Sequence, residues 1–501
     1  MRKPLPKKNR NHTVRSFTAA LSTVVLLTAA NPAWAQARGG EGDTRIGKIE
    51  FKNGYVTKET AAKLREELKF QAAVQIYLWS FPIANVMSLR DGHRAAGINN
   101  TSIPIFENYL TPKTVVPTGN QTTIYAYNVL TLSDKPLVLV VPPNVVGFIG
   151  DAWQRPQGDV GRPGPDKGKG GKYLIVPPGY EGKLPGKEGN YDWVVRAATK
   201  NVFWLVRAFV KDGDTKATIK NLQRTKLYPL SNPNAPQKYL NASKMPAYSI
   251  PPRGYAYWEL IAKALNEETV QVHDRAMMGM AAIFGMEKGK PFEPDAETRA
   301  LLVEAEKVAY AMNSTLSFES VLPNAPAYDN SQWEFAFLTN SPSFDAKHRL
   351  ELYERAAFTH QAMTGANAMV LKLRGKGSKY IFTTRDVDAK HLDGTNSYRL
   401  KVPANVPAKD FWSIAVYDVK KRSILDTGRP FSVVNSYMDL PVNKDGSIDI
   451  YFGPTPPPQG EKSWIKTKRG EGFFVYFRFY GPLEPFYDKT WKPGEIELVM
   501  P

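Results

Sequence analysis

The feature that most constrains this fold lies near the C-terminus, where residues 473–480 read Phe-Phe-Val-Tyr-Phe-Arg-Phe-Tyr. Because side chains alternate along a strand, one face of this run is wholly apolar. The other face carries Phe474, Tyr476, Arg478 and Tyr480. A guanidinium among such neighbours cannot stay unpaired in a core. Arg478 therefore either pairs with an internal carboxylate or faces a cavity that takes an anionic or polar ligand.

A second arginine occupies a similar setting. Residues 203–209 read Phe-Trp-Leu-Val-Arg-Ala-Phe, which is apolar on both faces. Strands of this kind are buried on both sides, so we expect Arg207 in the interior. Two interpretations remain open. Arg207 pairs with a carboxylate and holds a sheet to a helix, or it binds an anionic or hydroxyl-rich ligand, since its planar fork suits carboxylate and phosphate.

Three further residues are candidates for acid–base catalysis. Tyr125 shares a predicted strand face with Tyr127, and Tyr417 and Asp418 end another predicted strand. Tyrosine can act as an acid or a base, and aspartate as a base, when the environment shifts their pKa values. All three are also ordinary residues at the ends of strands, so a purely structural role remains the alternative.

Aromatic side chains supply the other candidates for ligand binding. Tyr476 and Tyr480 share the face of Arg478, and we expect both to line the same site. Trp412 and Trp464 are candidate stacking platforms for a sugar or an aromatic ring, with core packing as the alternative.

The sequence gives no motif for a metal or a cofactor. Cysteine is absent, and the six histidines show no pair at the spacing of metal ligands. The glycine-rich stretch 161–171 lacks the spacing of a phosphate-binding loop, and no Gly-x-Ser-x-Gly elbow occurs. We therefore expect no metal site and no cofactor.

The first 35 residues are typical of a secretory signal. Six basic residues precede an apolar stretch at 17–30, and Ala33-Trp-Ala35 provides the small residues before a cleavage site near Ala35. We expect no membrane span in the mature chain and a periplasmic location. Removing the signal lowers the formal charge from +18 to +12, with the basic residues scattered. Neither this pattern nor any motif favours nucleic acid as a partner.

The order of sequence patterns predicts an α+β chain with two β-sandwich, jelly-roll-like domains, a helical segment between them and an N-terminal helix. Thr57 is the expected N-cap of that first helix, and Pro82 is expected to bend or end it. Asp295 is expected to cap a later helix, and a second long helix is predicted over about 345–373, interrupted by Gly365. The predicted boundaries are a signal peptide at 1–35, an arm at 36–56, a first β-domain at 57–230, a linker and helical segment at 231–375, and a second β-domain at 376–501.

Several of these stretches resemble the bacterial proteins that join the domain-of-unknown-function families 1254 and 1214. The N-terminal resemblance rests on residues 74–82 and 136–143, and the C-terminal one on 411–418, 429–432 and 477–480. It implies an oligomeric envelope protein with β-sandwich domains around a helical segment, and it implies no chemistry. This chain departs from the usual Asn-x-Asp-Thr pattern, because Thr122 stands at the acidic position.

Three functional classes follow from these patterns. The first is a module that binds a small anionic or hydroxylated molecule, or a glycan fragment, in a cleft lined by aromatic residues and arginine. The second is a periplasmic hydrolase or lyase that uses Tyr/Asp acid–base chemistry. The third is a structural or assembly protein of the cell envelope. A homo-oligomer is compatible with each of them.

Overall fold

The computed structural model describes residues 42–499, except 187–188, 211–212, 246 and 321. The expected signal peptide, its cleavage site and the first part of the arm lie outside the described residues. The chain divides into two compact units, one ending at Glu67 and the other beginning at Leu68.

The first unit contains two short hairpins and the start of a long helix. Its elements are β1 (Gly42–Thr44), β2 (Gly47–Ile49), β3 (Phe51–Lys52), β4 (Tyr55–Val56) and the first turns of α1 (Lys58–Ala95). The Oγ1 of Thr57 accepts a hydrogen bond of 3.3 Å from the backbone N–H of Thr60. This contact satisfies one of the free donors at the helix start, so the predicted N-cap is confirmed.

Helix α1 does not end at Pro82 but continues through it to Ala95. Near the proline, side chains from elsewhere bind helix carbonyls: Arg355 donates to Trp79, and Gln154 donates to Pro82. By length and composition alone α1 could cross a membrane, which differs from the sequence-based prediction of no membrane span in the mature chain. However, 83% of its most apolar window is buried inside the fold, as in a core helix of a globular protein.

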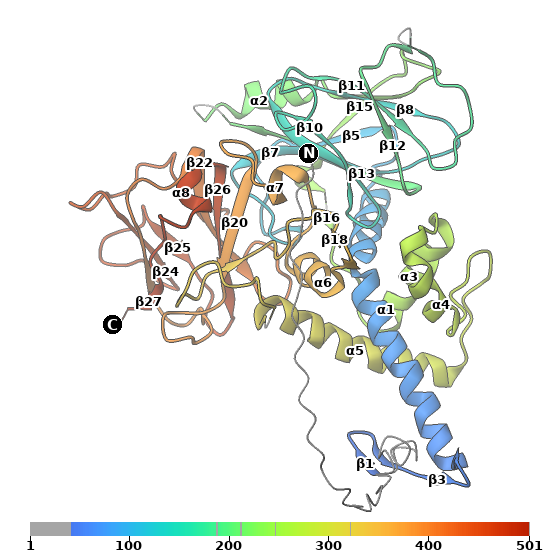
Figure 1. Ribbon diagram of the computed structural model, residues 1–501. Helices are drawn as coiled ribbons and strands as arrows, with labels where there is room; N and C mark the ends of the chain where they lie inside the picture. Colours follow the sequence, from blue (N-terminus) through green and yellow to red (C-terminus); the bar gives the residue numbers. More distant parts are fainter. Residues whose placement is uncertain (1–41, 187–188, 211–212, 246, 321, 500–501) are drawn as a thin grey trace, which may run out of the picture. The chain divides into compact units, whose positions relative to one another are not determined.

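Two sheets form the N-terminal β-region of the second unit (Figure 1). They share one hydrophobic cluster, to which Trp204 and Val206 contribute from one sheet and Leu139 and Ile175 from the other. The six-stranded sheet has the order β10 (Pro156–Gly161), β9 (Val145–Asp151), β13 (Asn201–Phe209), β7 (Thr123–Thr131), β5 (Ser102–Phe106) and β15 (Lys238–Asn241). The four-stranded sheet has the order β12 (Trp193–Arg196), β11 (Gly171–Val176), β8 (Leu137–Val141) and β14 (Lys226–Pro229).

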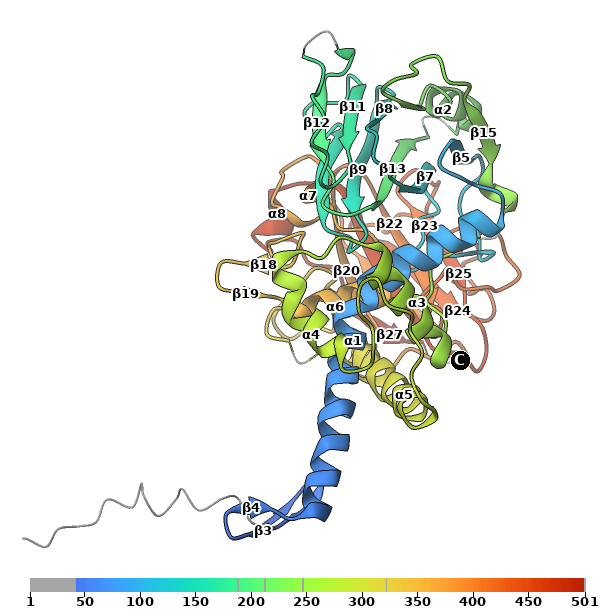
Figure 2. The ribbon, with the colours of Figure 1, turned by 90° about the vertical axis from the view of Figure 1, so that its right-hand side faces the viewer.

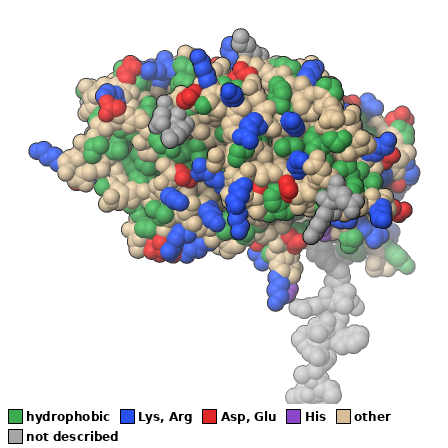
Figure 3. Space-filling model, turned by 90° about the horizontal axis from the view of Figure 1, so that it is seen from above, with side chains coloured by type: hydrophobic (Ala, Val, Ile, Leu, Met, Phe, Trp, Pro, Cys, Tyr) green, Lys and Arg blue, Asp and Glu red, His purple; other side chains and the backbone are tan. Residues whose placement is uncertain are grey.

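Short elements complete this region. Helix α2 (Thr215–Leu222) follows β13, and β6 (Thr114–Val115) pairs with β16 (Ala247–Tyr248) after the 3-10 turn η3 (Ala242–Lys244). Figure 3 shows Lys and Arg side chains spread over the face that it presents rather than gathered in one patch. This distribution agrees with the scattered basic residues of the sequence.

The middle of the chain is helical, but less regularly than predicted. Asp295 caps α5, because its Oδ1 accepts a hydrogen bond of 2.8 Å from the N–H of Thr298. The predicted long helix over 345–373 is wrong. That stretch contains a β18–β19 hairpin, two short helices and a loop at 362–366. The elements are α3 (Tyr255–Glu267), η4 (Val272–Asp274), α4 (Arg275–Ala282), α5 (Ala296–Phe318), β18 (Asp345–Ala346), β19 (Arg349–Leu350), α6 (Leu352–Gln361) and α7 (Asn367–Val370).

Two further sheets form the C-terminal region. The apolar face of β26 packs on the smaller sheet through a cluster that includes Phe477, Phe479, Leu400 and Phe452. The five-stranded sheet has the order β17 (Glu334–Phe335), β20 (Ser378–Thr383), β26 (Phe473–Pro482), β22 (Ala408–Asp418) and β23 (Val433–Asn435). The four-stranded sheet has the order β25 (Trp464–Lys466), β24 (Ile448–Gly453), β21 (Tyr398–Val402) and β27 (Ile496–Leu498), and α8 (Glu484–Tyr487) follows β26.

The α+β class, the long N-terminal helix and the helical middle segment are therefore confirmed. The remaining faces of the six-stranded and five-stranded sheets meet in one shared cluster, which holds Tyr125 and Phe203 from one sheet and Phe474 and Tyr476 from the other. In Figure 2 the labels of β7, β9 and β13 stand above those of β20 and β22. The meeting of these two faces positions the candidate site.

Candidate functional site

A cavity of about 100 Å³ lies where these two sheets meet. Tyr125 on β7 and Arg207 on β13 line it from the six-stranded sheet, and Tyr476 and Arg478 on β26 line it from the five-stranded sheet. Four of the residues singled out in the sequence, separated by up to about 350 positions, are thus brought to one site. Tyr380 on β20 also lines it.

Strand register explains why both arginines point into the same space. On β13, Arg207 stands opposite Tyr125 of β7 and Val146 of β9. On β26, Arg478 stands opposite Tyr380 of β20 and Ser413 of β22. The two-residue alternation predicted from the sequence therefore directs each guanidinium away from the apolar core of its own sheet pair.

Arg207 is buried, with 8% of its surface exposed. Its Nη2 donates a hydrogen bond of 2.8 Å to the Oγ of Ser378, and its Cζ lies 5.3 Å from the ring centroid of Tyr480. Burial lowers the pKa of Arg207, but the nearby hydroxyls of Tyr125, Tyr380 and Tyr480 raise that pKa more, so it ends above its ordinary value. The side chain remains charged in the interior.

Arg478 is equally enclosed, with 4% of its surface exposed. Its Nη2 donates a hydrogen bond of 2.8 Å to the carbonyl oxygen of Thr118. The guanidinium carbon lies 5.1 Å from the ring centroid of Tyr476 and 5.2 Å from that of Tyr417. Burial lowers the pKa of Arg478, and the hydroxyls of surrounding tyrosines raise it above its ordinary value.

Among the described residues, no carboxylate pairs with either arginine. Across residues 42–499, outside the four short gaps, none of the ion pairs within 4.0 Å includes Arg207 or Arg478. The described residues that line the cavity include no Asp or Glu. The contacts of the two cations include hydrogen bonds to Ser378 and to the carbonyl of Thr118, hydrogen bonds to the hydroxyls of Tyr125 and Tyr417, and aromatic rings. The first interpretation of Arg207, a pair with a carboxylate, is therefore not seen among the described residues.

The two tyrosines expected beside Arg478 have different positions. Tyr476 lines the cavity, and its hydroxyl donates a hydrogen bond of 2.7 Å to Oε1 of Gln361. Burial raises the pKa of Tyr476, so it stays neutral. Tyr480 lies behind the cavity wall, where its hydroxyl accepts a hydrogen bond of 2.6 Å from Nδ2 of Asn120 and its ring stacks on Phe411. Tyr480 therefore supports Arg207 rather than lining the cavity.

The three catalytic candidates are not brought together. Tyr125 lines the cavity, whereas Tyr417 donates a hydrogen bond of 2.7 Å to the carbonyl of Gly119 and is fully buried outside the lining. Burial raises the pKa of Tyr417 to about 12, although Arg478 opposes this effect. Asp418 accepts a hydrogen bond of 2.6 Å from the backbone N–H of Lys421 in a turn. Tyr417 and Asp418 are therefore not positioned to act together on a ligand in this cavity.

The two tryptophans also lie outside the cavity. Trp412 packs in the core between the C-terminal sheets, 5.6 Å from the ring centroid of Phe477, because its position on β22 points to the opposite face. Trp464 donates a hydrogen bond of 3.0 Å to the carbonyl of Gly453, and the guanidinium of Arg429 covers its ring. Core packing, the alternative considered for both, describes these positions.

The sequence patterns do not predict one wall of the cavity, the loop at 362–366. Ala362, Met363, Thr364 and Ala366 line the cavity. Thr364 has a φ of 88°, a costly conformation for a β-branched residue, and its N–H donates a hydrogen bond of 2.8 Å to Oε1 of Gln154. The one signal in the sequence is Gly365, which interrupts an otherwise helical pattern and marks the segment where the chain leaves the helix.

Thr122, which replaces the acidic residue usual in the resembling families, lies close behind the cavity. Its Oγ1 donates a hydrogen bond of 2.6 Å to Oδ1 of Asn120 and lies 3.4 Å from the hydroxyl of Tyr480. A carboxylate at this position would stand next to the tyrosine that Arg207 covers. In the part of the chain that the structure describes, no group of three or more His, Asp and Glu side chains is arranged to hold a metal ion.

Comparison with family models identifies two domains. Residues 101–229 match the model described as protein of unknown function DUF1254, and residues 377–484 match the model described as protein of unknown function DUF1214. The chain therefore carries one domain of each family, as the sequence motifs indicated. The cavity lies between them, with Arg207 in the first domain and Arg478 in the second.

A solved structure shows that the fold recurs. The VPA0106 protein from Vibrio parahaemolyticus is 18% identical and aligns with a TM-score of 0.54 over 86% of this chain and 100% of its own. A putative uncharacterized protein from Burkholderia cenocepacia is 13% identical, with a TM-score of 0.42 over 88% of this chain and 96% of its own. The first likeness concerns the fold alone. No curated protein matches this chain.

Proposed function

We propose that this chain is an exported binding protein that holds a small anionic ligand between Arg207 and Arg478. One observation carries the proposal: two buried arginines line the same cavity, and no carboxylate pairs with either among the described residues. Burying an uncompensated charge is costly, and burying two in one place is more so. An anion from outside the polypeptide supplies the missing compensation.

The chemistry of the guanidinium supports an oxyanion as the ligand. Arginine presents several N–H donors in a fixed plane, which matches carboxylate or phosphate oxygens. Each arginine donates from Nη2, Arg207 to Ser378 and Arg478 to the carbonyl of Thr118, and each is also hydrogen-bonded to a tyrosine hydroxyl, that of Tyr125 or Tyr417. A guanidinium carries five N–H donors, so each side chain has further donors with which to bind a ligand.

Three further expectations belong to this proposal. The leader-like sequence before Gln36 supports export to the periplasm after cleavage near Ala35. The sharing of one core by each pair of sheets supports two β-sandwich domains of jelly-roll-like type. The resemblance to envelope proteins supports a homo-oligomer.

A periplasmic hydrolase or lyase remains the second candidate, and one observation favours it. Tyr125 lines the cavity and stands opposite Arg207 in the sheet register, so its hydroxyl is placed where it can exchange a proton with a bound anion. Loss of turnover but not of binding in Tyr125→Phe would identify this activity.

Mass spectrometry of small molecules released from the natively purified protein tests the binding function. We expect the wild type to carry an acid that Arg478→Met does not, while circular dichroism shows both to be folded. Arg429→Met is a matched control, because Arg429 is half-exposed beside Trp464 and does not line the cavity. Equal ligand content in wild type and Arg478→Met would contradict the proposal.

A further inference from the structure

We propose that the ligand is a monocarboxylic acid with a short apolar body, held by its carboxylate at the two arginines. This inference rests on the proposed binding function and narrows its ligand class. The cavity is polar where the arginines lie and apolar over other parts of its lining.

The register defines the polar part of the cavity. Arg207 and Tyr125 are partners across β13 and β7, and Arg478 and Tyr380 are partners across β26 and β20. Tyr380 contributes to the raised pKa of both arginines, so the two guanidiniums share a neighbour. A single carboxylate can accept from one guanidinium with each of its oxygens.

The apolar part includes the next position on the same face of β13. Leu205 lies two residues before Arg207 on that face, and it stands opposite Phe148 of β9. Both Leu205 and Phe148 line the cavity. Apolar side chains from the middle of the chain complete the lining: Ala336, Phe358, Ala362, Met363, Ala366, Ala368 and Met369.

The size of the cavity limits the ligand. A volume of about 100 Å³ has room for roughly seven to ten water-sized groups, because one such group needs about 10–15 Å³ of this space. Straight-chain acids of five or six carbons and benzoate fall within this limit. A disaccharide does not.

The lining also disfavours other small anions and sugars. A sugar needs hydrogen-bond acceptors for its hydroxyls. In the side-chain amide of Asn120, Nδ2 already donates to the hydroxyl of Tyr480, and Oδ1 already accepts from the hydroxyl of Thr122. Phosphate could pair with both arginines, but it would leave the apolar side chains of Leu205 and Phe148 without an apolar contact from the ligand. A ligand with an apolar body would cover these side chains and remove their surface from water.

Isothermal titration calorimetry of the purified protein with acetate, propionate, butyrate, pentanoate and hexanoate tests this inference. We expect affinity to rise about fourfold with each added methylene until the cavity is full, because each buried methylene adds a constant increment of about that size. Tighter binding of phosphate or succinate than of pentanoate would overturn the inference and leave the proposed anion-binding function intact. No binding of any anion would contradict both.

Ala366→Leu provides an independent check in the apolar part of the cavity. Ala366 is buried and lines the cavity, so three added carbons should displace the tail of the ligand but not its carboxylate. We expect at least tenfold weaker binding of hexanoate and unchanged binding of acetate, with thermal melts showing that the variant is folded. If Ala366→Leu fails to fold, Ala368→Val replaces it as the smaller addition to the same wall. Equal loss for acetate and hexanoate would contradict the placement of the tail.

Discussion

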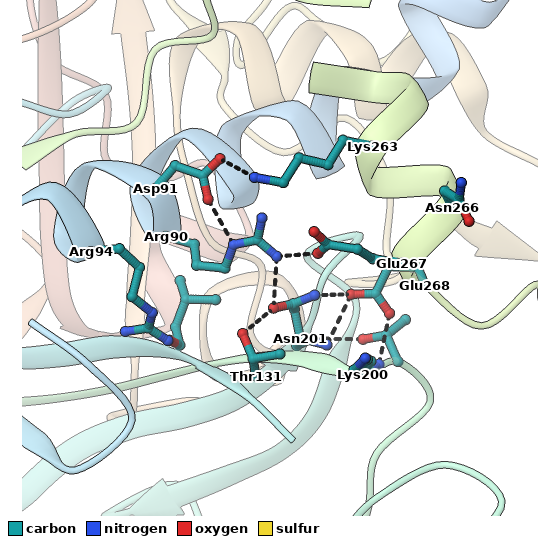
Figure 4. A network of polar contacts seen from close by, with 12 residues as sticks. Arg90, Asp91, Arg94, Thr131, Lys200, Asn201, Lys263, Asn266, Glu267 and Glu268 are labelled. Carbon is teal, nitrogen blue, oxygen red and sulfur yellow. Dashed lines mark hydrogen bonds and ion pairs between the residues drawn. The ribbon is translucent and has the colours of Figure 1, made fainter. Parts of the chain in front are cut away.

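Two regions of this protein bury arginine in opposite ways. At the C-terminal end of α1, Arg90 is bound by carboxylates: its Nε pairs with Asp91 at 2.9 Å, and its Nη1 contacts Glu267 and Asn201. Figure 4 shows this network, in which Glu268 also binds Asn201. Arg207 and Arg478 are as deeply buried, yet none of the described residues gives either of them the same kind of partner. The comparison separates a cation paired within the fold from two cations that we propose bind a ligand.

The largest expected effect is on the Arg90 network. Arg90→Met removes a buried cation from the partly exposed carboxylates of Glu267 and Asp91, so the expected cost of about 2–3 kcal/mol of unfolding free energy lies between the costs for exposed and fully buried pairs. Urea unfolding followed by circular dichroism measures this loss. Lys263→Met is the control, because Lys263 contacts Asp91 from an exposed position and its loss should change stability little. An unchanged midpoint of urea unfolding for Arg90→Met would contradict the claim that Arg90 stabilises the fold.

The next effect is a pH dependence in the same region. Burial lowers the pKa of His93 from its ordinary 6.5 to about 4, with Arg94 adding to this effect and Asn128 opposing it. The folded protein therefore takes up a proton at His93 less readily than the unfolded chain. The contribution of neutral His93 to the unfolding free energy is therefore fully present above about pH 6.5 and is lost as the pH falls toward 4.

We expect this group to account for about 2 kcal/mol of the stability lost between pH 7 and pH 5. Urea titrations at both values, on the wild type and on His93→Gln, measure the difference. The variant should lose less stability than the wild type over this interval. The same pH dependence in both proteins would show that His93 does not titrate in this way.

A smaller effect is expected from giving the second region the carboxylate that it lacks. Thr122→Asp places a negative charge beside Tyr480, near Arg207, where it competes with an external anion. Hexanoate binding should weaken about tenfold in calorimetry, which corresponds to a loss of about 1.4 kcal/mol of binding free energy. Thr122→Asn is the uncharged control and should bind as the wild type does. Equal weakening in both variants would indicate a packing effect instead.

The smallest expected effect is the change in unfolding free energy caused by Arg478→Met in the second region. Arg478→Met removes no carboxylate partner, and an apolar side chain of similar length in a buried site is often neutral or stabilising. The unfolding free energy of ligand-free Arg478→Met should therefore stay within about 1 kcal/mol of the wild type in urea titrations. A loss as large as that of Arg90→Met would mean that Arg478 is structural and would remove the contrast between the two regions.

The sequence predicts the local part of this site well. The alternation in 473–480 and 203–209 assigns Arg478 and Arg207 to the correct strand faces, because a strand has a period of two residues whatever it packs against. Capping by Thr57 and Asp295 is predicted for the same reason, since these contacts span three residues.

The sequence does not predict how the two faces meet. Arg207 reaches Ser378 across 171 positions, and Asn120 reaches Tyr480 across 360, so no local pattern specifies these contacts. The loop at 362–366 is mispredicted as helix, because its two alanines and Met363 favour a helix locally while hydrogen bonding to Gln154 holds Thr364 outside one. Tertiary contacts override local preference at this wall of the cavity.

The most direct test of the central claim is a crystal structure of the protein soaked with hexanoate. The account predicts density for one acid in the cavity, with its carboxylate within hydrogen-bond distance of both Arg207 and Arg478 and its chain toward Leu205. A structure in which an Asp or Glu of the protein pairs with these arginines, or in which the cavity stays free of acid, would contradict it.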